Sequence, residues 1–507
     1  MERAAIKPQH FSNPPLESTL AIGATNATNI RAWYRTGSTG RFELRWGLED
    51  SSQCDGQLAV TVSDDLADYT GSEILEPLQA SQRYWLKLCD EQGQVLAQGS
   101  FRTAASDDCE PEKFSLALMS CHQPFENNGD IRSSSEDMLT AMHKVLEQHQ
   151  VDQVIMGGDQ MYSDMPGTMS LFDDDYFKTV APEGKQTILE CSAEEVRQLF
   201  HQRYRHFWNV PGWKKLLANY ACYPAIDDHD IIDNWGSAIE HNQPQWQNFR
   251  QGAFQAFVDY QGSLIHHPSQ VPPPSFDFAS EFGSIGTYFL DIRSNRRVGD
   301  SPRIVSSQQL EDLKQYLANN GDKEFLFLVL SVPLVHLPKP LTRLAARITP
   351  EGEDFSDRWS TRGHRHDRDL IAAMLHQHQR DYPEQKMVLL SGDIHIGCVH
   401  SISWEDQPPN LYQFISSGIT HDTGKVIQFL SSLIIRTKRT LHVKTGPHAK
   451  VQLLPGVDDD KSNPCGDMNM GIVEITRNKE TGAPQLQFML YSNEHGEPVC
   501  KFRSEFL

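Results

Sequence analysis

The sequence lacks the features that mark exported, membrane-spanning and disulfide-stabilised proteins. Residues 1–20 contain no apolar stretch of the kind that a secretory signal needs. The longest strongly apolar run, residues 325–335, is too short to cross a bilayer and contains a proline near its end. The nine cysteines are odd in number and stand singly, without the paired spacing of a disulfide framework. We therefore expect a cytoplasmic protein whose thiols mostly fill core space.

The sequence also lacks an excess of basic residues. It has 46 lysines and arginines against 67 aspartates and glutamates, and its formal net charge is −21. An acidic surface repels polyanions over roughly a Debye length, which argues against a stable complex with nucleic acid or an anionic membrane. The basic run at 436–450 is expected to be a solvated segment. An anionic substrate would have to be attracted locally, by a metal ion or by a few arginines.

The patterning divides the chain into two parts. Residues 15–103 contain short alternating segments separated by Gly, Asp, Ser and Asn clusters, which predicts a small antiparallel sandwich. We assign residues 1–104 to an immunoglobulin- or fibronectin-like β-sandwich domain and the acidic stretch 105–113 to a linker. In residues 114–507, apolar runs alternate with amphipathic helical stretches, so we predict an α/β domain that ends in a β-hairpin.

Polar residues directly follow several predicted strands of the α/β domain. In open α/β sheets the ligand site lies beyond the carboxyl ends of the strands, so these residues are expected to converge although they are far apart in sequence. The segments concerned are Ser-Cys at 120–121, Gly-Asp-Gln-Met-Tyr at 158–162, Asp-Asp-His-Asp at 227–230, Asp-Ile-Arg at 291–293 and Gly-Asp-Ile-His at 392–395.

The glycines before Asp159 allow the backbone to turn sharply, so that this carboxylate can point into a cleft and bridge two metal ions. Tyr162, three residues later, could add a phenolate, a hard oxygen ligand that suits ferric iron. Asp228 stands among three carboxylates around the imidazole of His229, and their mutual repulsion indicates a cation. Each motif also has a plain alternative, an aspartate that caps a helix or a solvated acidic turn.

Asp393 and His395 are two apart on an extended segment, so both side chains can point to one place and form a ligand pair. The alternative is two polar side chains at a strand end without a metal. Cys121 stands at the same predicted edge of the sheet, which makes it a candidate thiolate ligand, although most lone cysteines are buried filler.

Taken in order, these motifs resemble the metallophosphoesterase superfamily, and most closely its alkaline phosphatase D (PhoD-type) branch. That branch has Ser-Cys, here Ser120-Cys121, and Asp-Asp-His-Glu, here residues 227–230 with Asp230 in place of glutamate. It also has Leu-Asp-x-Arg-x-x-Arg, here residues 290–296, before Gly-Asp-x-His. The resemblance covers about residues 114–425, and a sandwich domain before the catalytic domain is similar to the same branch.

The resemblance implies a layered αββα catalytic domain with a binuclear metal centre, for which Fe³⁺ with Ca²⁺ is the expected pair and other divalent ions are the alternative. By motif match, the iron-like ion would be held by Cys121, Asp159, Tyr162 and His395, and the calcium-like ion by Asp159, Asp228 and Asp393. Thiolate, phenolate and imidazole suit a transition metal, whereas carboxylates suit a hard alkaline-earth ion.

The expected reaction is attack of a metal-activated hydroxide on a phosphate monoester or diester. His229 is expected to protonate the leaving oxygen, and Arg293 to grip a nonbridging oxygen of a small phosphate-ester substrate. Arg296 and His336 are weaker candidates. A diester-specific phosphodiesterase is the first alternative. A binding or structural protein in which the acidic motifs are solvated turns is the second.

Overall fold

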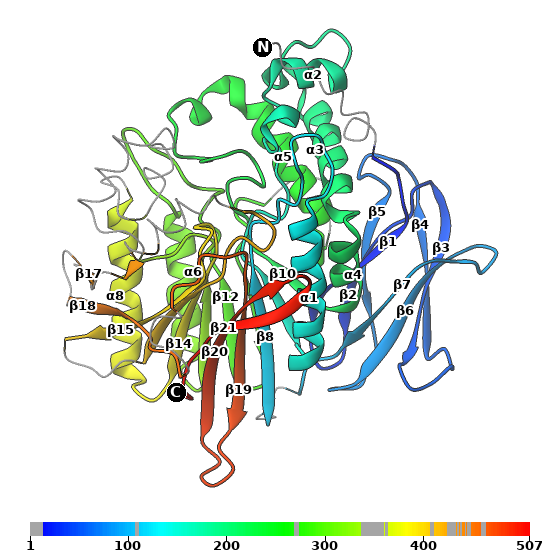
Figure 1. Ribbon diagram of the computed structural model, residues 1–507. Helices are drawn as coiled ribbons and strands as arrows, with labels where there is room; N and C mark the ends of the chain where they lie inside the picture. The colour runs from blue at the N-terminus through cyan, green and yellow to red at the C-terminus, as the bar shows by residue number, and fades with distance from the viewer. Residues whose placement is uncertain are drawn as a thin grey trace.

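The computed structural model describes residues 14–106, 111–267, 273–335, 359, 364–405, 410–422, 432, 435–436, 439–441, 443, 448–457 and 463–507. His336 lies outside these residues, as does most of the basic run at 436–450. Among the described residues, the structure has two large mixed sheets with helices on both outer faces, and a smaller sheet at one side (Figure 1).

The first large sheet contains three parallel strands that carry site motifs at their carboxyl ends, β8, β9 and β10. The C-terminal strands continue this sheet beyond β8, because β19 pairs antiparallel with β8 and with β20. The described strands follow the order β21 (Glu497–Arg503), β20 (Pro484–Glu494), β19 (Met470–Arg477), β8 (Lys113–Met119), β9 (Gln153–Met156), β10 (Ala221–Pro224), β1 (Thr19–Thr25), β2 (Ile30–Arg35) and β5 (Thr70–Leu75).

The second large sheet has a parallel centre and antiparallel edges. Strands β12, β13, β14 and β16 pair in parallel, and β11 and β15 run against their neighbours. The described order is β11 (Phe278–Phe282), β12 (Ile285–Phe289), β13 (Phe325–Val329), β14 (Lys386–Ser391), β16 (Leu411–Ile415), β15 (Cys398–Trp404), β18 (Ala449–Leu453) and β17 (Arg439–Leu441).

The side chains of β8 point alternately to the two faces of the sheet, and this alternation shows how the sequence produces these layers. Phe114, Leu116 and Leu118 belong to the core between the two sheets, where Phe114 lies 4.7 Å from Phe282 of the second sheet. Ala117 and Met119 point the other way, into the core under the helices that cover the first sheet. Those helices are α1 (Ser133–His149), α3 (Ala193–Trp208), α4 (Pro211–Asn219) and α5 (Gln247–Tyr260).

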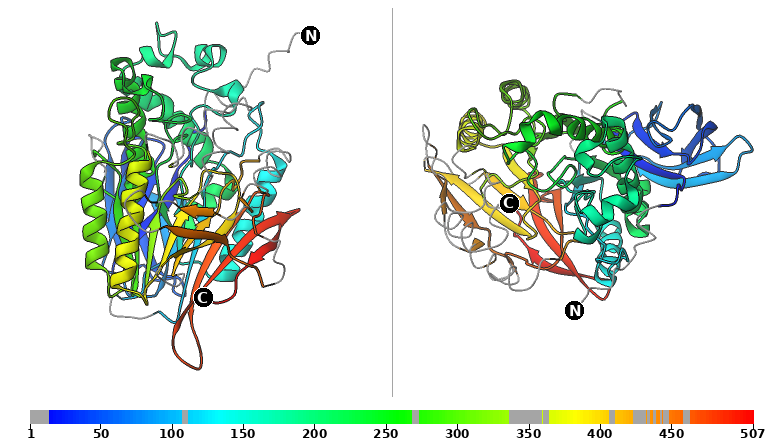
Figure 2. Two further views of the ribbon diagram at one scale, coloured as in Figure 1. Left: turned by 90° about the vertical axis from the view of Figure 1, so that its left-hand side faces the viewer. Right: turned by 90° about the horizontal axis from the view of Figure 1, so that it is seen from above.

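The outer face of the second sheet is covered by α6 (Ser307–Asn319) and α8 (Arg365–Asp381), as the side view of Figure 2 shows. Their apolar residues pack with outward-facing residues of β13 and β14. The order of layers is therefore helix, sheet, sheet, helix, as the sequence predicts. Capping boxes at Ser192 and Ser306 define the starts of α3 and α6.

The N-terminal region is all β, and it is joined to the first large sheet. The strands β3 (Gly40–Leu48), β4 (Gly56–Val62), β6 (Arg83–Asp90) and β7 (Val95–Arg102) form a separate antiparallel sheet. Strands β1, β2 and β5 instead extend the large sheet, because Ile22 of β1 pairs with Ala221 of β10. Residues 14–104 thus lie at one side of the helix-covered layers (Figure 2, right) and share a sheet with them.

A buried polar network strengthens this junction. The carboxylate of Asp68 is 2% exposed and accepts hydrogen bonds from the guanidinium of Arg205 on α3 and from the hydroxyl of Tyr260 on α5. Arg35 of β2 donates to the same tyrosine hydroxyl at 3.0 Å. Because these groups are withdrawn from water, each depends on the others for its hydrogen bonds.

Replacing Asp68 by asparagine is expected to lower the free energy of unfolding by about 3 kcal/mol, because it leaves the largely buried Arg205, whose side chain is 16% exposed, without its counter-charge. Urea unfolding of wild type and variant measures the difference. Asp322→Ala, at an exposed turn before β13, is the control and should change stability by less than about 0.5 kcal/mol. A loss no larger than in the control would show that the network adds little at the junction.

Candidate metal centre

The loops that follow β8 and β9 are hydrogen-bonded to each other where the strands end, and the loop that follows β14 packs against both. The amide of Cys121 donates to the carbonyl of Gly158 at 3.2 Å, and that of His122 to the carbonyl of Asp159 at 2.8 Å. The loop after β14 lies so close to the loop after β8 that a Cβ on Gly392 would be 2.3 Å from the hydroxyl oxygen of Ser120. Only glycine fits there. The convergence of these strand ends, expected from the sequence, is present.

Four of the predicted metal ligands have left-handed backbone conformations. The φ angles are 58° at Cys121, 57° at Asp159, 64° at Asp393 and 53° at His395. Side-chain residues rarely adopt such angles, and they persist only where the surrounding structure enforces them. Such strain is concentrated at functional sites.

Asp159 is the hub of the cluster. One of its carboxylate oxygens accepts from the thiol of Cys121 at 3.3 Å and from the hydroxyl of Tyr162 at 3.4 Å. Its other oxygen accepts from the amide of His229 at 3.2 Å. The thiol also lies 3.3 Å from the hydroxyl of Ser417. Thiol, phenol and carboxylate thus face one point in a buried site.

A second carboxylate group adjoins this hub. Oxygens of Asp159, Asp227 and Asp228 lie within 4.8 Å of one another, and all three residues are buried. Arg293 has no exposed surface and lies between two of them, with its Nε bonded to Asp227 and an Nη 3.3 Å from Asp228. The structure therefore places Arg293 against the carboxylates of the cluster, where it partly balances their charge.

Burial and neighbouring carboxylates perturb the ionisation of the hub. Burial, and then the proximity of Cys121, Asp227 and Asp228, raises the pKa of Asp159 well above its usual value. Burial likewise raises the pKa values of the Cys121 thiol and the Tyr162 phenol. A nearby cation would favour the ionised form of all three groups.

Asp230 does not belong to the carboxylate cluster, although the sequence groups it with Asp228. Its carboxylate is fully buried and accepts from three backbone amides, those of Asp159 at 3.0 Å, Gln160 at 3.1 Å and Asp227 at 3.0 Å. The side chain of Gln261 donates a fourth bond at 2.7 Å. Asp230 therefore ties the two motif loops together through their backbones.

Asp230→Ala is expected to lower the free energy of unfolding by about 3 kcal/mol, because it leaves three buried amides without an acceptor. Chemical unfolding followed by circular dichroism measures this loss, with Asp322→Ala as the control. A variant as stable as wild type would contradict the bridging role.

Asp393 and His395 lie on the more open side of the centre, where both are partly exposed. The amide of His395 donates to the hydroxyl of Ser417 at 2.9 Å, and this hydroxyl also contacts the thiol of Cys121. His395 Nε2 lies 2.8 Å from Nδ1 of His421, a residue that the sequence analysis missed. His421 follows β16, and its position three residues after the turn at Gly418 was the only signal for it.

Asp164, which contacts His229, is the second residue that the sequence analysis missed. The Nδ1 of His229 lies 2.9 and 3.1 Å from the two carboxylate oxygens of Asp164, and the imidazole ring packs 4.4 Å from the ring of Tyr162. Burial by itself lowers the pKa of His229, but Asp164, Asp228 and Asp159 outweigh burial and raise that pKa well above its usual value. The imidazolium form is therefore favoured.

The donor set is of a kind that can bind metal. Buried carboxylates gather here with a thiol, a phenol and an imidazole, and the guanidinium of Arg293 contacts Asp227 and Asp228. Thiol, phenol and imidazole are ligands that transition metals prefer, and a carboxylate cluster suits a harder cation. Arg296 lies apart from this set, 4% exposed and with an Nη 3.3 Å from Nδ1 of His364.

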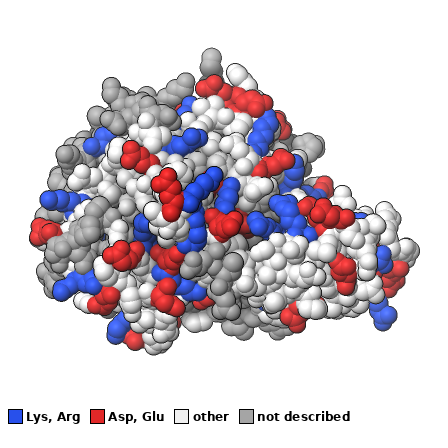
Figure 3. Space-filling model, turned by 90° about the horizontal axis from the view of Figure 1, so that it is seen from below, with Lys and Arg blue, Asp and Glu red and all other residues white. Residues whose placement is uncertain are grey.

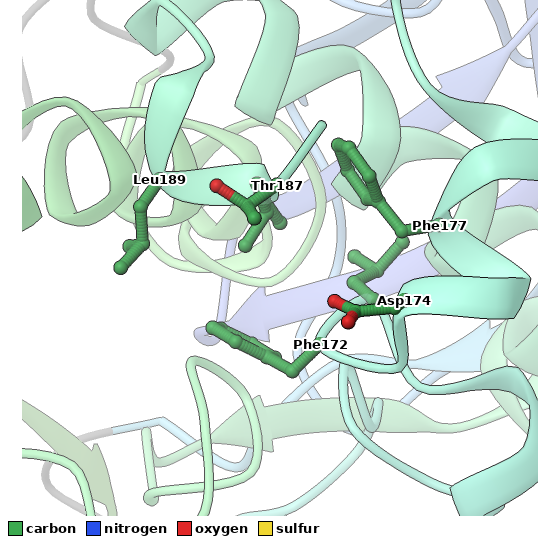
Figure 4. A pocket seen from close by; sticks show the side chains of 7 residues that line it. Phe172, Asp174, Phe177, Thr187 and Leu189 are labelled. Carbon is green, nitrogen blue, oxygen red and sulfur yellow. The ribbon is translucent and has the colours of Figure 1, made fainter. Parts of the chain in front are cut away.

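A separate cavity of about 190 Å³ lies between α2 (Asp174–Val180), the residues just before it and the segment 187–189, and none of the predicted ligands lines it (Figure 4). Its wall joins the site loop at one point, where the amide of Leu171 donates to the carbonyl of Ser163 at 3.0 Å. The lining is mainly apolar, with exposed Asp174 and Thr187 at the rim. The donor geometry, rather than this cavity, marks the place where chemistry can occur.

The surface adds two observations. Figure 3 shows one face, on whose described part acidic and basic side chains are intermixed, so that this face offers no broad field of one sign. Within the described residues, none of the helices combines the length and the apolar character that crossing a membrane requires.

Comparison with known proteins identifies the family. The family model of the PhoD-like phosphatases matches residues 116–453. The solved structure described as the structure of PhoD matches with a TM-score of 0.62 at 13% sequence identity, over 99% of this chain and 93% of that one. This likeness confirms the predicted fold class, an α/β catalytic domain preceded by an all-β region.

A curated yeast relative, the uncharacterized protein YGR266W of Saccharomyces cerevisiae, is 22% identical over 374 residues. The match includes 58% of this chain and 52% of that protein, so the chain spans about half the length of the curated relative. The resemblance read from the motifs is confirmed by the family match, which covers more than half of the sequence. The chain belongs to the PhoD-like phosphatase family.

Proposed function

We propose that the protein is a metal-dependent phosphoesterase that hydrolyses small phosphate monoesters or diesters at the centre around Asp159. The observation that carries this proposal is the convergence of Cys121, Tyr162 and Asp228 on that one carboxylate, from the ends of three strands of a PhoD-like fold. If these aspartates only capped helices, a thiol and a phenol would not be needed beside them.

The division of ligands follows the chemistry of the donors. Cys121, Asp159, Tyr162 and His395 would hold a transition metal, for which Fe³⁺ is the proposed ion. Asp159, Asp228 and Asp393 would hold a hard cation, for which Ca²⁺ is proposed. When bound, the ions would supply positive charge that neutralises the phosphate and acidifies an attacking water.

Two residues of the chain would complement the metal ions: His229 as the proton donor to the leaving oxygen, and Arg293 as a partner of the carboxylates. As oxygen from water forms its bond to phosphorus, the ester P–O bond breaks, and His229 would give its Nε2 proton to the departing oxygen. Arg293 takes a different role from the substrate clamp that the motif suggests. Because its guanidinium is fully buried between Asp227 and Asp228, it would position carboxylates rather than reach a substrate.

Hydrolysis of 4-nitrophenyl phosphate and bis(4-nitrophenyl) phosphate by the purified protein tests this function. We expect turnover of at least one ester, its loss on chelation, and its recovery when iron and calcium are returned. The ratio of the two rates separates a monoesterase from a diester-specific enzyme. A protein that binds no metal and hydrolyses neither ester after reconstitution would be a binding or structural protein. Cytoplasmic residence stays a prediction from the sequence.

A further inference from the structure

The loop that follows β16 carries Ser417, a fully buried residue whose hydroxyl contacts two of the proposed metal ligands. The backbone amide of His395 donates to this hydroxyl at 2.9 Å. The sulfur of Cys121 lies 3.3 Å from the same hydroxyl. One buried hydroxyl therefore connects a proposed ligand that follows β8 with another that follows β14.

The surrounding bonds set the direction of the bond between Ser417 and the sulfur. The thiol of Cys121 directs its one proton to a carboxylate oxygen of Asp159 at 3.3 Å, and a metal-bound thiolate has no proton to give. The hydroxyl of Ser120, 3.5 Å from the sulfur, donates to a backbone carbonyl of the loop after β16 at 3.2 Å. The oxygen of Ser417 already accepts from His395, so its own proton is left for the sulfur.

Asn469, directly before β19, holds the backbone of this loop. Its side chain is fully buried, and its Nδ2 donates to the carbonyl of Ser417 at 2.7 Å and to that of Asp467 at 2.9 Å. Its Oδ1 accepts from the hydroxyl of Ser416 at 3.0 Å. Because water does not reach these groups, the loop depends on this one amide for its place. Asn469 lies beyond residues 116–453, to which the family match extends.

We propose that Ser417 is a positioning residue for the metal centre: its hydroxyl donates to the sulfur of Cys121 and fixes the backbone of His395, and Asn469 holds Ser417 where both bonds form. This inference rests on the proposed function and deepens it. A hydrogen bond to a ligating sulfur orients it and stabilises its negative charge, so it changes both the affinity for the metal and the electronic character of the metal–sulfur bond. A serine that only filled space would change neither.

Ser417→Ala removes the hydroxyl and keeps the carbonyl that Asn469 holds. We expect its affinity for Fe³⁺, measured by competition with a chromophoric chelator, to fall by about 10- to 100-fold. The absorption band of the iron–thiolate bond, identified as the band that Cys121→Ser lacks, should move to longer wavelength. The reason is that a sulfur without its hydrogen bond holds its electrons less tightly. The phenolate band, which Tyr162→Phe lacks, should stay in place.

Further variants separate this role from core packing. Ser417→Thr keeps the hydroxyl and should recover most of the affinity and the position of the band. Ser115→Ala is the matched control, because Ser115 is equally buried but lies at the other end of β8 from Cys121. It should bind Fe³⁺ with wild-type affinity.

Asn469→Ala should weaken iron binding as well. The double variant Ser417→Ala/Asn469→Ala should lose little more than Ser417→Ala, because Asn469 acts through Ser417. If Asn469→Ala does not fold, Ser417→Ala and Ser417→Thr still decide the role of the hydroxyl.

Three results would overturn the proposal in a wild type that binds iron and hydrolyses an aryl phosphate. Unchanged affinity and an unmoved thiolate band in Ser417→Ala would show that the hydroxyl plays no part in the centre. An equal loss in Ser115→Ala would make the effect one of core packing. Fully additive losses in the double variant would show that Asn469 acts by another route. A wild-type protein that binds no iron and hydrolyses no ester would instead refute the proposed function, and this inference with it.

Discussion

Asp159→Ala is expected to lower kcat/KM by more than about 10³-fold, the largest effect of any substitution in this chain. The variant removes the carboxylate that contacts Cys121, Tyr162 and the backbone of His229. If Asp159 is shared by two metal ions, both lose a ligand at once. Charge stabilisation by metal ions amounts to several kcal/mol in the transition state, and each 1.36 kcal/mol is a factor of ten in rate.

The measurement is steady-state hydrolysis of an aryl phosphate beside metal content, with Asp322→Ala as the matched control. Asp322 precedes β13, at the edge of the sheet opposite to Ser331, which contacts Asp227. The control should therefore retain wild-type activity and metal. If the activity of Asp159→Ala stayed within about 10-fold of wild type, the reaction would not depend on this carboxylate.

Cys121→Ser is expected to weaken binding of the transition metal by more than the roughly 10- to 100-fold that substitution of outer-shell groups costs. The hydroxyl of serine can still contact Asp159 and Ser417, so the local bonds have a replacement. It cannot replace a thiolate, because an alkoxide forms far less readily and is a harder ligand. Competition with a chromophoric chelator measures the affinity, and activity should fall with iron content.

Cys222→Ser is the control for this substitution. Cys222 is fully buried in β10 of the same sheet, and its thiol donates to the backbone carbonyl of Tyr220 at 3.3 Å. Any general cost of placing a hydroxyl in this core should appear in both variants. Metal affinity that is unchanged in Cys121→Ser, or equally reduced in Cys222→Ser, would make Cys121 a core-filling residue.

The sequence allows the fold and the meeting point of the motifs to be predicted for a simple reason. Strands β8, β9, β10 and β14 are apolar runs that end directly in polar residues, and parallel strands bring such ends to one edge. Cys121, Asp159 and Asp228 were therefore identifiable from their positions after strands. Their left-handed turns were not, because the pattern of residue types does not specify φ at a non-glycine residue.

Other features depend on pairings that no local pattern encodes. Asp164 and His421 contact His229 and His395 from distant parts of the chain, and neither has a spacing that marks it as a partner. The sequence groups Asp230 with Asp228, yet its contacts are to backbone amides. The joining of the N-terminal strands to the large sheet could not be predicted for the same reason, because the pairing of Ile22 with Ala221 connects strands about 200 residues apart.

The most direct test of the metal-centre assignment is elemental analysis of the purified wild-type protein beside Asp159→Ala and Cys121→Ser, with hydrolysis of an aryl phosphate followed on the same samples. We predict near-stoichiometric iron with a second divalent ion in the wild type, and loss of metal and of activity together in Asp159→Ala. Substoichiometric metal in an active wild type, with unchanged activity in both variants, would contradict the binuclear centre while leaving the PhoD-like fold in place.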